Sequence, residues 1–292
     1  MRADDSRLAA YLALAATVAG ISWSAIFVRW ADVPGAVSAL YRVAIAAAVL
    51  GPWRIVRGPR KPVSARAVWT AVAGGVFFAL DLALWNTAVL KTQAAVASLL
   101  GNNTPIFVAL MSWVLFRRRP AAAFWIGLAL SLLGCFSILS VNLKGGQGSL
   151  AGDLFALGAS FFFAAYLVAT ERVRETMDTL TFNTLAIAGS LAALLVICLA
   201  LNLPLGGISA RGWWALAGLG LVTQLAAYYA LVYALGHLPA TVTSVGLLAQ
   251  VPCTAVLAWL FLGEPLTPPQ IAGGVTVLAG IYVVNSAPFR WR

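Results

Sequence analysis

Ten stretches of mostly apolar residues, each about 20 residues long, run through this 292-residue chain. A helix needs roughly that length to cross about 30 Å of hydrocarbon, whereas the strands of a membrane β-barrel are shorter and alternate. The first stretch is too long for a signal peptide and lacks a small-residue cleavage site, so we expect a retained helix. The stretches are residues 8–30, 34–53, 67–90, 93–116, 121–141, 151–170, 179–202, 212–235, 240–262 and 270–289. They predict an all-α, polytopic membrane protein with ten transmembrane helices.

The composition excludes the other broad classes of protein. Apolar residues (AVILMFWYC) make up 62% of the chain and charged residues only 10%, against about 45–50% and about 25% in soluble domains. At a mean hydropathy of +0.92, a soluble fold would leave much apolar surface in water. Intrinsic disorder is excluded as well, because too little of the chain is polar.

The positions of the basic residues orient the chain, because cytoplasmic loops retain Lys and Arg. With the N-terminus inside, 14 of the 19 basic residues lie in inside segments, four lie outside and Arg42 lies within a span. The net charge of +10 therefore reports topology, with both termini cytoplasmic. We expect no nucleic-acid partner, since no basic stripe with interleaved aromatics lies outside the spans. The inside residues are Arg2, Arg7, Arg54, Arg57, Arg60, Lys61, Arg66, Arg117, Arg118, Arg119, Arg172, Arg174, Arg290 and Arg292.

The residues that most often bind metals offer no pattern here. Cys135, Cys198 and Cys253 fall inside apolar stretches without CxxC spacing, which is typical of buried, inert thiols. His237 is the only histidine and lies in the short turn between the eighth and ninth stretches. We expect no metal and no cofactor.

The two halves of the chain repeat each other. A shift of 143 residues aligns Ala13-Leu14 with Ala156-Leu157 and Trp23 with Tyr166, and a shift of 146 aligns six further residues with identical ones. Those six are Ala94, Val96, Ser98, Trp113, Gly127 and Gly134, which meet Ala240, Val242, Ser244, Trp259, Gly273 and Gly280. Each half, residues 1–145 and residues 146–292, contains five of the stretches. An odd number predicts that the second half enters the membrane upside down.

The charges agree with this inversion. The basic loop 54–66 is inside, whereas its counterpart 203–211 carries a single Arg and would be outside. Two inverted repeats suit alternating access, in which similar halves rock about a site at the bilayer midplane. A duplication retained only for folding is the alternative.

Several motifs carry a resemblance to a known family. They are Ile21-Ser22-Trp23, Tyr41-Arg42, Ala94-Ala95-Val96-Ala97-Ser98 followed by Pro105, and Phe261-Leu262-Gly263-Glu264-Pro265-Leu266 followed by Gly273 and Gly280. With these motifs and its 5+5 layout, the chain resembles the ten-helix EamA-type members of the drug/metabolite transporter superfamily. Arg117-Arg118-Arg119 departs from that pattern, because the family often has an acidic residue there. Bacterial amino-acid exporters, including aromatic amino-acid exporters, look similar in length and layout, so the resemblance implies export of a small metabolite across the inner membrane.

Two charged residues lie deep in the predicted spans. Arg42 and Asp81 are about 12 Å and about 15 Å from the outer ends of their helices, at 1.5 Å per residue. An isolated charge at such a depth costs about 2.5–3.5 kcal/mol on insertion scales. We therefore expect the two residues to form an intramembrane charge pair or to bracket a shared polar cavity. They could recognise the carboxylate and ammonium of an amino acid, or Asp81 could carry a proton; a permanent structural salt bridge is the alternative.

Two prolines interrupt corresponding spans near their middles. Pro105 follows Asn102-Asn103-Thr104, and Pro252 follows Gln250-Val251. Proline removes a backbone donor and disturbs the helix, and such backbone is tolerated in a membrane only where protein or a water-filled cavity satisfies it. Matching interruptions in two halves point to a transporter site. Asn102, Asn103 and Gln250 are therefore candidate substrate ligands, with simple packing kinks as the alternative.

Deep aromatic and amide side chains complete the candidate site. Trp23, Trp85, Tyr166 and Tyr228 could line an amphipathic pocket or stack on an organic cation, although helix packing would also explain each of them. Asn86 follows Trp85, one turn after Asp81, and Gln224 with Tyr228 occupies the equivalent span of the second half. These residues join the predicted substrate-binding set.

The combination favours a secondary transporter over other functions. The chain lacks a Walker A motif, so an ATP-driven pump is disfavoured, and it lacks HExxH and GxSxG motifs, which disfavours an intramembrane enzyme. A channel or non-transporting scaffold is a third class. The expected partners are a small-molecule substrate, an amino acid first, and the lipid bilayer of a bacterial inner membrane; a monomer suffices.

Overall fold

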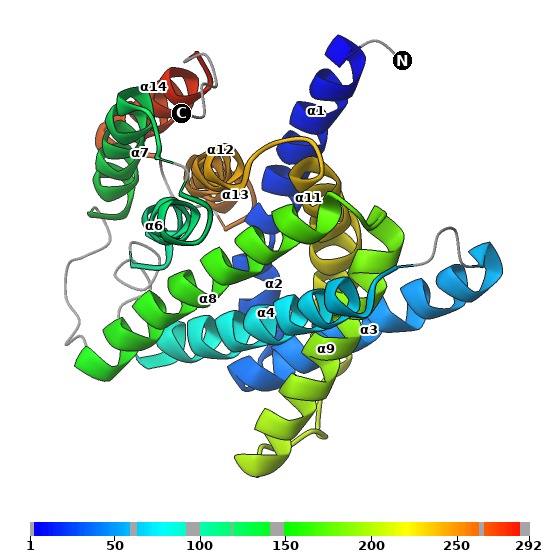
Figure 1. Cartoon of the computed structure of the whole chain (residues 1–292). Helices are drawn as coiled ribbons and strands as arrows, with labels where there is room; N and C mark the ends of the chain where they lie inside the picture. Colours follow the sequence, from blue (N-terminus) through cyan, green and yellow to red (C-terminus); the bar gives the residue numbers. More distant parts are fainter. Residues whose placement is uncertain are drawn as a thin grey trace.

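The computed structural model describes residues 3–58, 63–91, 100–117, 119–140, 149–262 and 266–286, and within these ranges it contains helices and no strand (Figure 1). The first half forms α1 (Ala3–Ser22), α2 (Ser24–Ala31), α3 (Gly35–Arg57), α4 (Ala65–Lys91), α6 (Thr104–Phe116) and α7 (Ala122–Ser140). The second half forms α8 (Leu150–Arg174), α9 (Thr179–Ala200), α10 (Ala210–Gly218), the π-helix η1 (Leu219–Ala227), α11 (Tyr228–Leu235), α12 (Ala240–Gly246), the 3-10 helix η2 (Leu247–Ala249), α13 (Gln250–Leu262) and α14 (Pro268–Ser286).

The expected membrane spans correspond to these helices. Among the described residues, eight helices are long and apolar enough to cross a membrane, and Thr104–Phe116 is a shorter apolar helix. The tenth expected stretch is α14, which has 19 residues and packs along α7. The predicted all-α, polytopic class is confirmed. Some parts of the predictions fall outside the described residues. They are residues 93–99 of the fourth stretch, the motif residues 94–98 and 263–265, residue 141 of the fifth stretch and residues 287–289 of the tenth.

Four of the spans are interrupted rather than continuous. The first breaks at Trp23 between α1 and α2, the eighth contains η1, and the ninth contains η2. In the fourth, residues 102–103 form a turn before α6. Pro105 stands at the start of α6, where a missing N–H removes no helical hydrogen bond. Pro252 stands in the first turn of α13, directly after η2. The breaks at 102–103 and at η2 therefore fall at positions related by the 146-residue shift.

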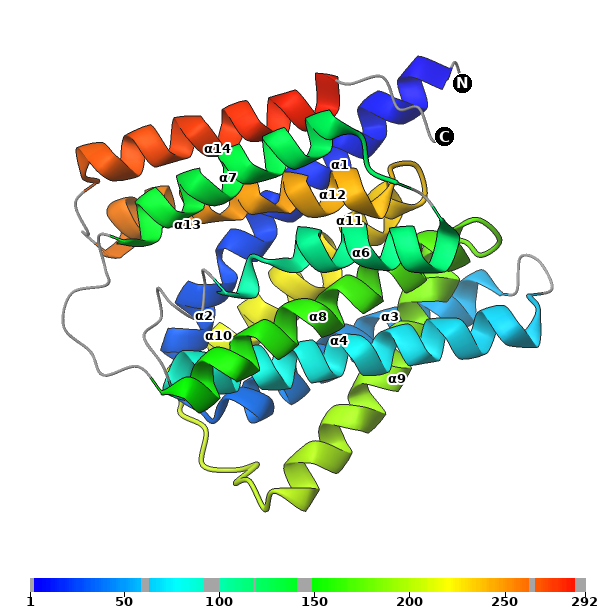
Figure 2. The same cartoon turned by 60° about the vertical axis from the view of Figure 1, so that its left-hand side comes forward.

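The inversion of the two repeats is visible where α7 meets α14. These helices run side by side in Figures 1 and 2, and their glycines allow backbone contact: a Cβ on Gly127 would lie 2.5 Å from the Gly280 carbonyl oxygen, and one on Gly134 would lie 2.5 Å from that of Gly273. The 146-residue shift carries Gly127 to Gly273 and Gly134 to Gly280, so exchanging the repeats turns the Gly127–Gly280 contact into the Gly134–Gly273 contact. Midway between them, Ser131 Oγ donates to the carbonyl of Val277, its own partner 146 residues away, at 3.4 Å. The two helices are therefore antiparallel about a local two-fold axis.

The start of α1 and the end of α14 lie at the same end of the bundle as the turn between α8 and α9 (Figure 2). Tyr11 donates to Asn285 Oδ1 at 2.9 Å. The Arg172 guanidinium lies over the Phe116 ring, which brings the ends of α6 and α8 together. We call the end of the bundle that holds the start of α1, the end of α14 and the turn between α8 and α9 the basic end. At the opposite end, Tyr41 donates to the Leu205 carbonyl at 2.6 Å.

Candidate substrate site

Arg42 lies at the centre of the helices, with only 5% of its surface exposed. Its Nε donates to Gln224 Oε1 at 2.8 Å and its Nη1 donates to Ser24 Oγ at 3.4 Å. Within the described part of the chain, Nη2 is buried and has no hydrogen-bond partner. A buried cation is unfavourable unless its hydrogen bonds are made. The guanidinium therefore presents a pair of N–H donors that a ligand or water must satisfy.

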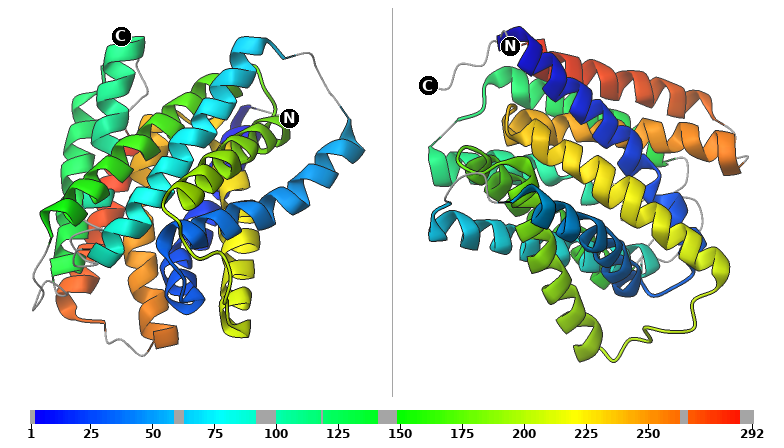
Figure 3. Two further views of the ribbon diagram at one scale, coloured as in Figure 1. Left: turned by 90° about the horizontal axis from the view of Figure 1, so that it is seen from below. Right: turned by 90° about the vertical axis from the view of Figure 1, so that its right-hand side faces the viewer.

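The π-helix η1 places Gln224 opposite Arg42. A π-turn holds one extra residue, is rare, and occurs frequently at functional sites. Helix α1 runs beside the eighth span (Figure 3, right), and side chains bond across the contact in both directions. Thr17 Oγ1 of α1 donates to the Ala227 carbonyl of η1 at 3.1 Å, and Thr223 Oγ1 of η1 donates to the Gly20 carbonyl of α1 at 3.3 Å. On the other side, Gly220 lets η1 approach α3 so closely that a Cβ would lie 2.6 Å from Ile45 Cβ.

Aromatic rings line one side of the guanidinium. The Cζ atom of Arg42 lies 5.1 Å from the ring centre of Tyr228 and 5.9 Å from that of Phe78. These two rings are 4.7 Å apart, and the Tyr166 ring lies 5.0 Å from Phe78. Cation–π attraction at such distances is worth about 2 kcal/mol when desolvated. The rings therefore help to hold the cation in place.

Asp81 lies on α4 one helical turn beyond Phe78 and is half-buried. The expected direct salt bridge is not formed: among the described residues the ion pair within 4.0 Å is Arg172–Glu175, and Arg42 uses Gln224 and Ser24 instead. Arg42 and Asp81 nevertheless act on each other electrostatically. That Arg42 and Asp81 bracket a shared polar cavity, the other arrangement expected from the sequence, stays a prediction. We call Arg42, Ser24, Gln224, Phe78, Tyr228, Tyr166 and Asp81 the Arg42 cluster.

A second group of polar residues joins the two helix interruptions. Gln250 Nε2 donates to Asn102 Oδ1 at 3.3 Å, which links the break of one repeat to that of the other. Ser22 Oγ donates to the Gln250 carbonyl at 3.4 Å. The Trp85 ring lies beside Gly101, where an added Cβ would lie 3.3 Å from it. Asn102 and Gln250, which the sequence grouped at the two interruptions, are therefore neighbours, and Trp85 lies beside Gly101 at the first of them.

Other predicted residues have local partners. Both hydrogen bonds of the Asn86 amide go to α3, one to the Gly35 carbonyl at 2.7 Å and one to Ser38 Oγ at 3.2 Å. Asn86 thus fixes α4 against α3 and does not face the Arg42 cluster. Asn103 Nδ2 donates to the Leu100 carbonyl at 3.0 Å within its own turn. Trp23 stacks on Phe27, with ring centres 5.8 Å apart, and contacts the tilted ring of Phe261 at 4.7 Å.

The sequence analysis missed Ser24 and Phe78. Phe78 precedes Asp81 by three residues, a spacing that places both on one face of a helix, so it could have been found. Ser24 gave no such signal, because a serine beside Trp23 is unremarkable until α2 is known to cross α3.

Two inverted sets of membrane-length helices around a buried polar cluster are the architecture of a secondary transporter. The comparisons agree. The sequence profile of the EamA-like transporter family matches residues 7–140 and again residues 150–286. The chain belongs to this family, and so to the drug/metabolite transporter superfamily.

Individual relatives are also transporters. The chain is 29% identical over 211 residues to the uncharacterized transporter YwfM of Bacillus subtilis, covering 72% of this chain and 70% of that one. It is 29% identical over 263 residues to the pseudopaline exporter CntI of Pseudomonas aeruginosa, covering 87% of each, and 28% identical over 215 residues to the threonine/homoserine exporter RhtA of Salmonella typhimurium, covering 70% and 68%. A crystal structure at 19% identity superposes over 96% of both chains with a TM-score of 0.78, which shows a shared fold.

Proposed function

We propose that this chain exports a small, amphipathic metabolite bearing a carboxylate, an amino acid first, and that Arg42 binds the carboxylate. The observation that carries the proposal is the buried Nη2 group of Arg42, which has no partner among the described residues. Two N–H donors on a cation match a carboxylate oxygen, and charge-assisted hydrogen bonds of this kind are about twice as strong as neutral ones. Gln224 and Ser24 hold the guanidinium while Nη2 is left for the substrate.

Asp81 supplies the opposite charge. An ammonium group bound near Asp81, with its carboxylate on Arg42, would keep the site neutral overall. The rings of Phe78, Tyr166 and Tyr228 would contact the apolar part of the substrate. The alternative role of Asp81 is proton antiport, in which the carboxylate takes a proton when the substrate leaves.

The transport cycle follows from the two repeats. In alternating access the site opens to each side in turn as one half rocks against the other. The hydrogen bond between Gln250 and Asn102 crosses from one repeat to the other and would break or shift in that motion. The excess of basic residues at one end supports cytoplasmic termini in a bacterial inner membrane, and the similarity to the exporters CntI and RhtA supports the outward direction.

Counterflow in proteoliposomes tests the proposal. Vesicles preloaded with unlabelled amino acids are mixed with a trace of each labelled amino acid, and the panel includes organic acids and amines without the second group. Saturable exchange of a carboxylate-bearing solute is expected. Exchange of amines alone would contradict the proposal, and so would the absence of any solute exchange by well-folded protein.

The same vesicles separate the two roles of Asp81. With Asp81→Asn, an ammonium role predicts weaker binding of zwitterions at every pH gradient, whereas a proton role predicts exchange that persists while uptake driven by a pH gradient is lost. Arg66→Gln, a change at an exposed position, is the control.

A further inference from the structure

A polar pocket lies at the basic end, away from the Arg42 cluster. Its volume is about 180 Å³, and it lies between the end of α3, the end of α8 and the start of α9. One water needs about 10–15 Å³ of such space, so the pocket has room for a tetrahedral anion. It is lined by Arg54, Arg57, Gly58, Arg174, Asp178, Thr179, Leu180, Thr181 and Tyr229.

The pocket carries an excess of positive charge. Its one carboxylate, Asp178, already caps α9: Oδ1 accepts from the backbone N–H groups of Leu180 and Thr181, and Oδ2 accepts from Thr181 Oγ1. Partial burial opposes ionisation, but these hydrogen bonds, together with Arg174, lower the pKa of Asp178 below its ordinary value. The carboxylate is therefore ionised and its oxygens are in use.

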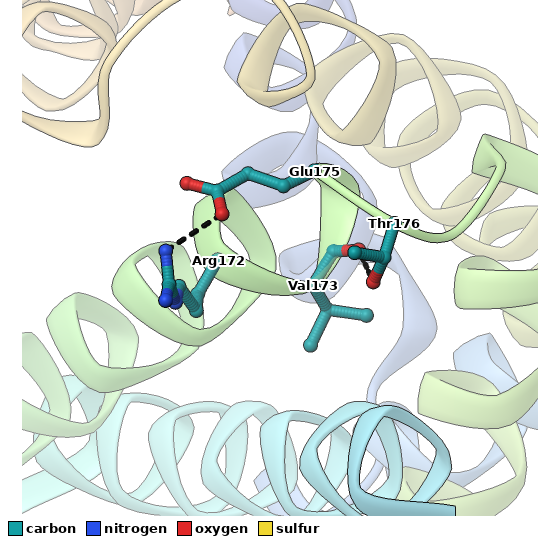
Figure 4. Close-up of polar contacts among 4 residues, drawn as sticks. All are labelled: Arg172, Val173, Glu175 and Thr176. Carbon is teal, nitrogen blue, oxygen red and sulfur yellow. Dashed lines mark hydrogen bonds and ion pairs between the residues drawn. The ribbon is translucent and has the colours of Figure 1, made fainter. Parts of the chain in front are cut away.

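The three arginines are not equivalent. Arg174 is committed to the fold, because Nε donates to the Val232 carbonyl at 3.2 Å and Nη1 to that of Met177. Arg172, nearby on α8, pairs with Glu175 at 2.6 Å on the outer surface (Figure 4). Arg54 and Arg57, three residues apart and so on one face of α3, form no ion pair with any acidic side chain that the structure describes. They are the cations that remain for a ligand.

The surroundings of this pair favour a lipid. The Arg57 guanidinium lies 5.3 Å from the Trp53 ring centre, and Trp53 stacks on Tyr229 at 5.6 Å. Tryptophan and tyrosine gather at the membrane interface. Between the two arginines, Ile55 and Val56 are 81% and 85% exposed, in the last turn of a membrane span. A cationic pocket thus stands beside exposed apolar side chains at the depth where headgroups meet acyl chains.

We propose that this pocket binds the phosphate of an anionic phospholipid from the leaflet at the basic end, through Arg54 and Arg57, with the acyl chains along Ile55 and Val56. Basic pockets between transmembrane helices bind anionic headgroups by the same chemistry. The lipid would tie the end of α3, the helix that carries Arg42, to the start of α9. The site is independent of the substrate proposed above.

Thermal unfolding of the full chain in detergent tests this site. Phosphatidylglycerol is titrated against phosphatidylcholine, and inorganic phosphate is added in a separate series. Phosphatidylglycerol is expected to raise the unfolding midpoint of the unmodified protein by about 5 °C, whereas phosphate has no effect. The shift is expected to disappear in Arg54→Gln with Arg57→Gln, and to remain largely in Arg54→Lys with Arg57→Lys.

The control is Arg66→Gln with Arg119→Gln, which removes the same charge at exposed positions outside the pocket and is expected to keep the shift. Equal loss in the pocket pair and the control pair would overturn the proposal, because it would indicate diffuse attraction. A shift reproduced by inorganic phosphate would overturn it too, since the ligand would then be a free anion. If phosphatidylglycerol does not raise the unfolding midpoint of the unmodified protein, the proposal is overturned as well.

Discussion

The contact between α7 and α14 and the Arg42 cluster are built on opposite principles. The α7–α14 contact obeys the two-fold relation between the repeats, with Gly127 against Gly280 and Gly134 against Gly273. The Arg42 cluster draws on both repeats but is not symmetric. A shift of 143 residues carries Asp81 to Gln224 and Trp85 to Tyr228, while Arg42 falls on Leu185.

The difference reflects what each region must do. Two helices in lipid associate through close packing of small residues, and such packing is satisfied when both copies keep the same glycines. A substrate with a positive and a negative group needs unlike partners, so an acid and an amide occupy equivalent positions. The two halves of the chain therefore keep the same residues where helices only pack, and carry different residues where polar groups gather.

The largest effect is expected from Arg42→Met. Loss of a buried, hydrogen-bonded charge that binds substrate costs about 2–5 kcal/mol, so exchange is expected to fall by about 30-fold or more. Stability should be unchanged or higher, because an apolar side chain replaces a buried charge. Counterflow and thermal unfolding measure the two effects. A lower unfolding midpoint with normal exchange would make Arg42 a structural residue.

Gln224→Met should have the next largest effect. It leaves Nε of Arg42 without its acceptor, and a hydrogen bond to a charged group is worth about 1.5–3 kcal/mol. Substrate affinity is expected to fall by about 10-fold or more in a binding assay. Leu221→Met, an exposed position in the same π-helix, is the control; equal affinity in both variants would exclude a role for Gln224 in holding the guanidinium.

Gly280→Ala tests the symmetric region. The new Cβ would lie 2.4 Å from the Gly127 carbonyl oxygen, and overpacking of this kind typically costs about 1–3 kcal/mol. The unfolding midpoint should fall by several degrees, while substrate affinity stays unchanged. Gly274→Ala in the same helix, where the nearest atom is 3.4 Å away, should be tolerated. If both variants behave alike, the close contact is not a source of stability.

The smallest effect is expected from Gln250→Leu. Its 3.3 Å bond to Asn102 joins neutral groups, and such a bond contributes about 0.5–1.5 kcal/mol. Exchange rates are expected to change by up to about 10-fold, with affinity less affected, since the bond links the repeats rather than the substrate. Val256→Leu, an exposed change on α13, is the control. Unchanged exchange rates would show that the Gln250–Asn102 hydrogen bond has no role in the transport cycle.

The sequence predicts this fold well because its main determinant is local. A run of about 20 apolar residues is stable in a bilayer as a transmembrane helix. Pro105 and Pro252 predict the helix interruptions that precede them. The π-helix could not be predicted, since Leu219–Ala227 contains neither proline nor an unusual charge. The Ala227 carbonyl of this segment accepts from Thr17 of α1, a partner that exists only once α1 lies alongside.

Side-chain partners were harder to predict than positions. Arg42 and Asp81 stand out as charges in apolar stretches, and matching depth suggested that they meet. Gln224 takes the place expected of Asp81 because η1 and α3 approach closely at Gly220. Asn86 looked like a ligand for its depth alone, yet it serves the contact between α3 and α4. Such choices depend on helix crossings that one sequence does not specify.

The most direct test pairs a change in the substrate with a change in the protein. An exchanged amino acid and its carboxamide are compared as competitors in counterflow, with the unmodified protein and with Arg42→Gln. If Nη2 binds the carboxylate, the unmodified protein should prefer the acid by about 100-fold, because the amide cannot pair with the charge, and the variant should bind both about equally. A preference for the acid that persists undiminished in Arg42→Gln would contradict the proposed role of Arg42.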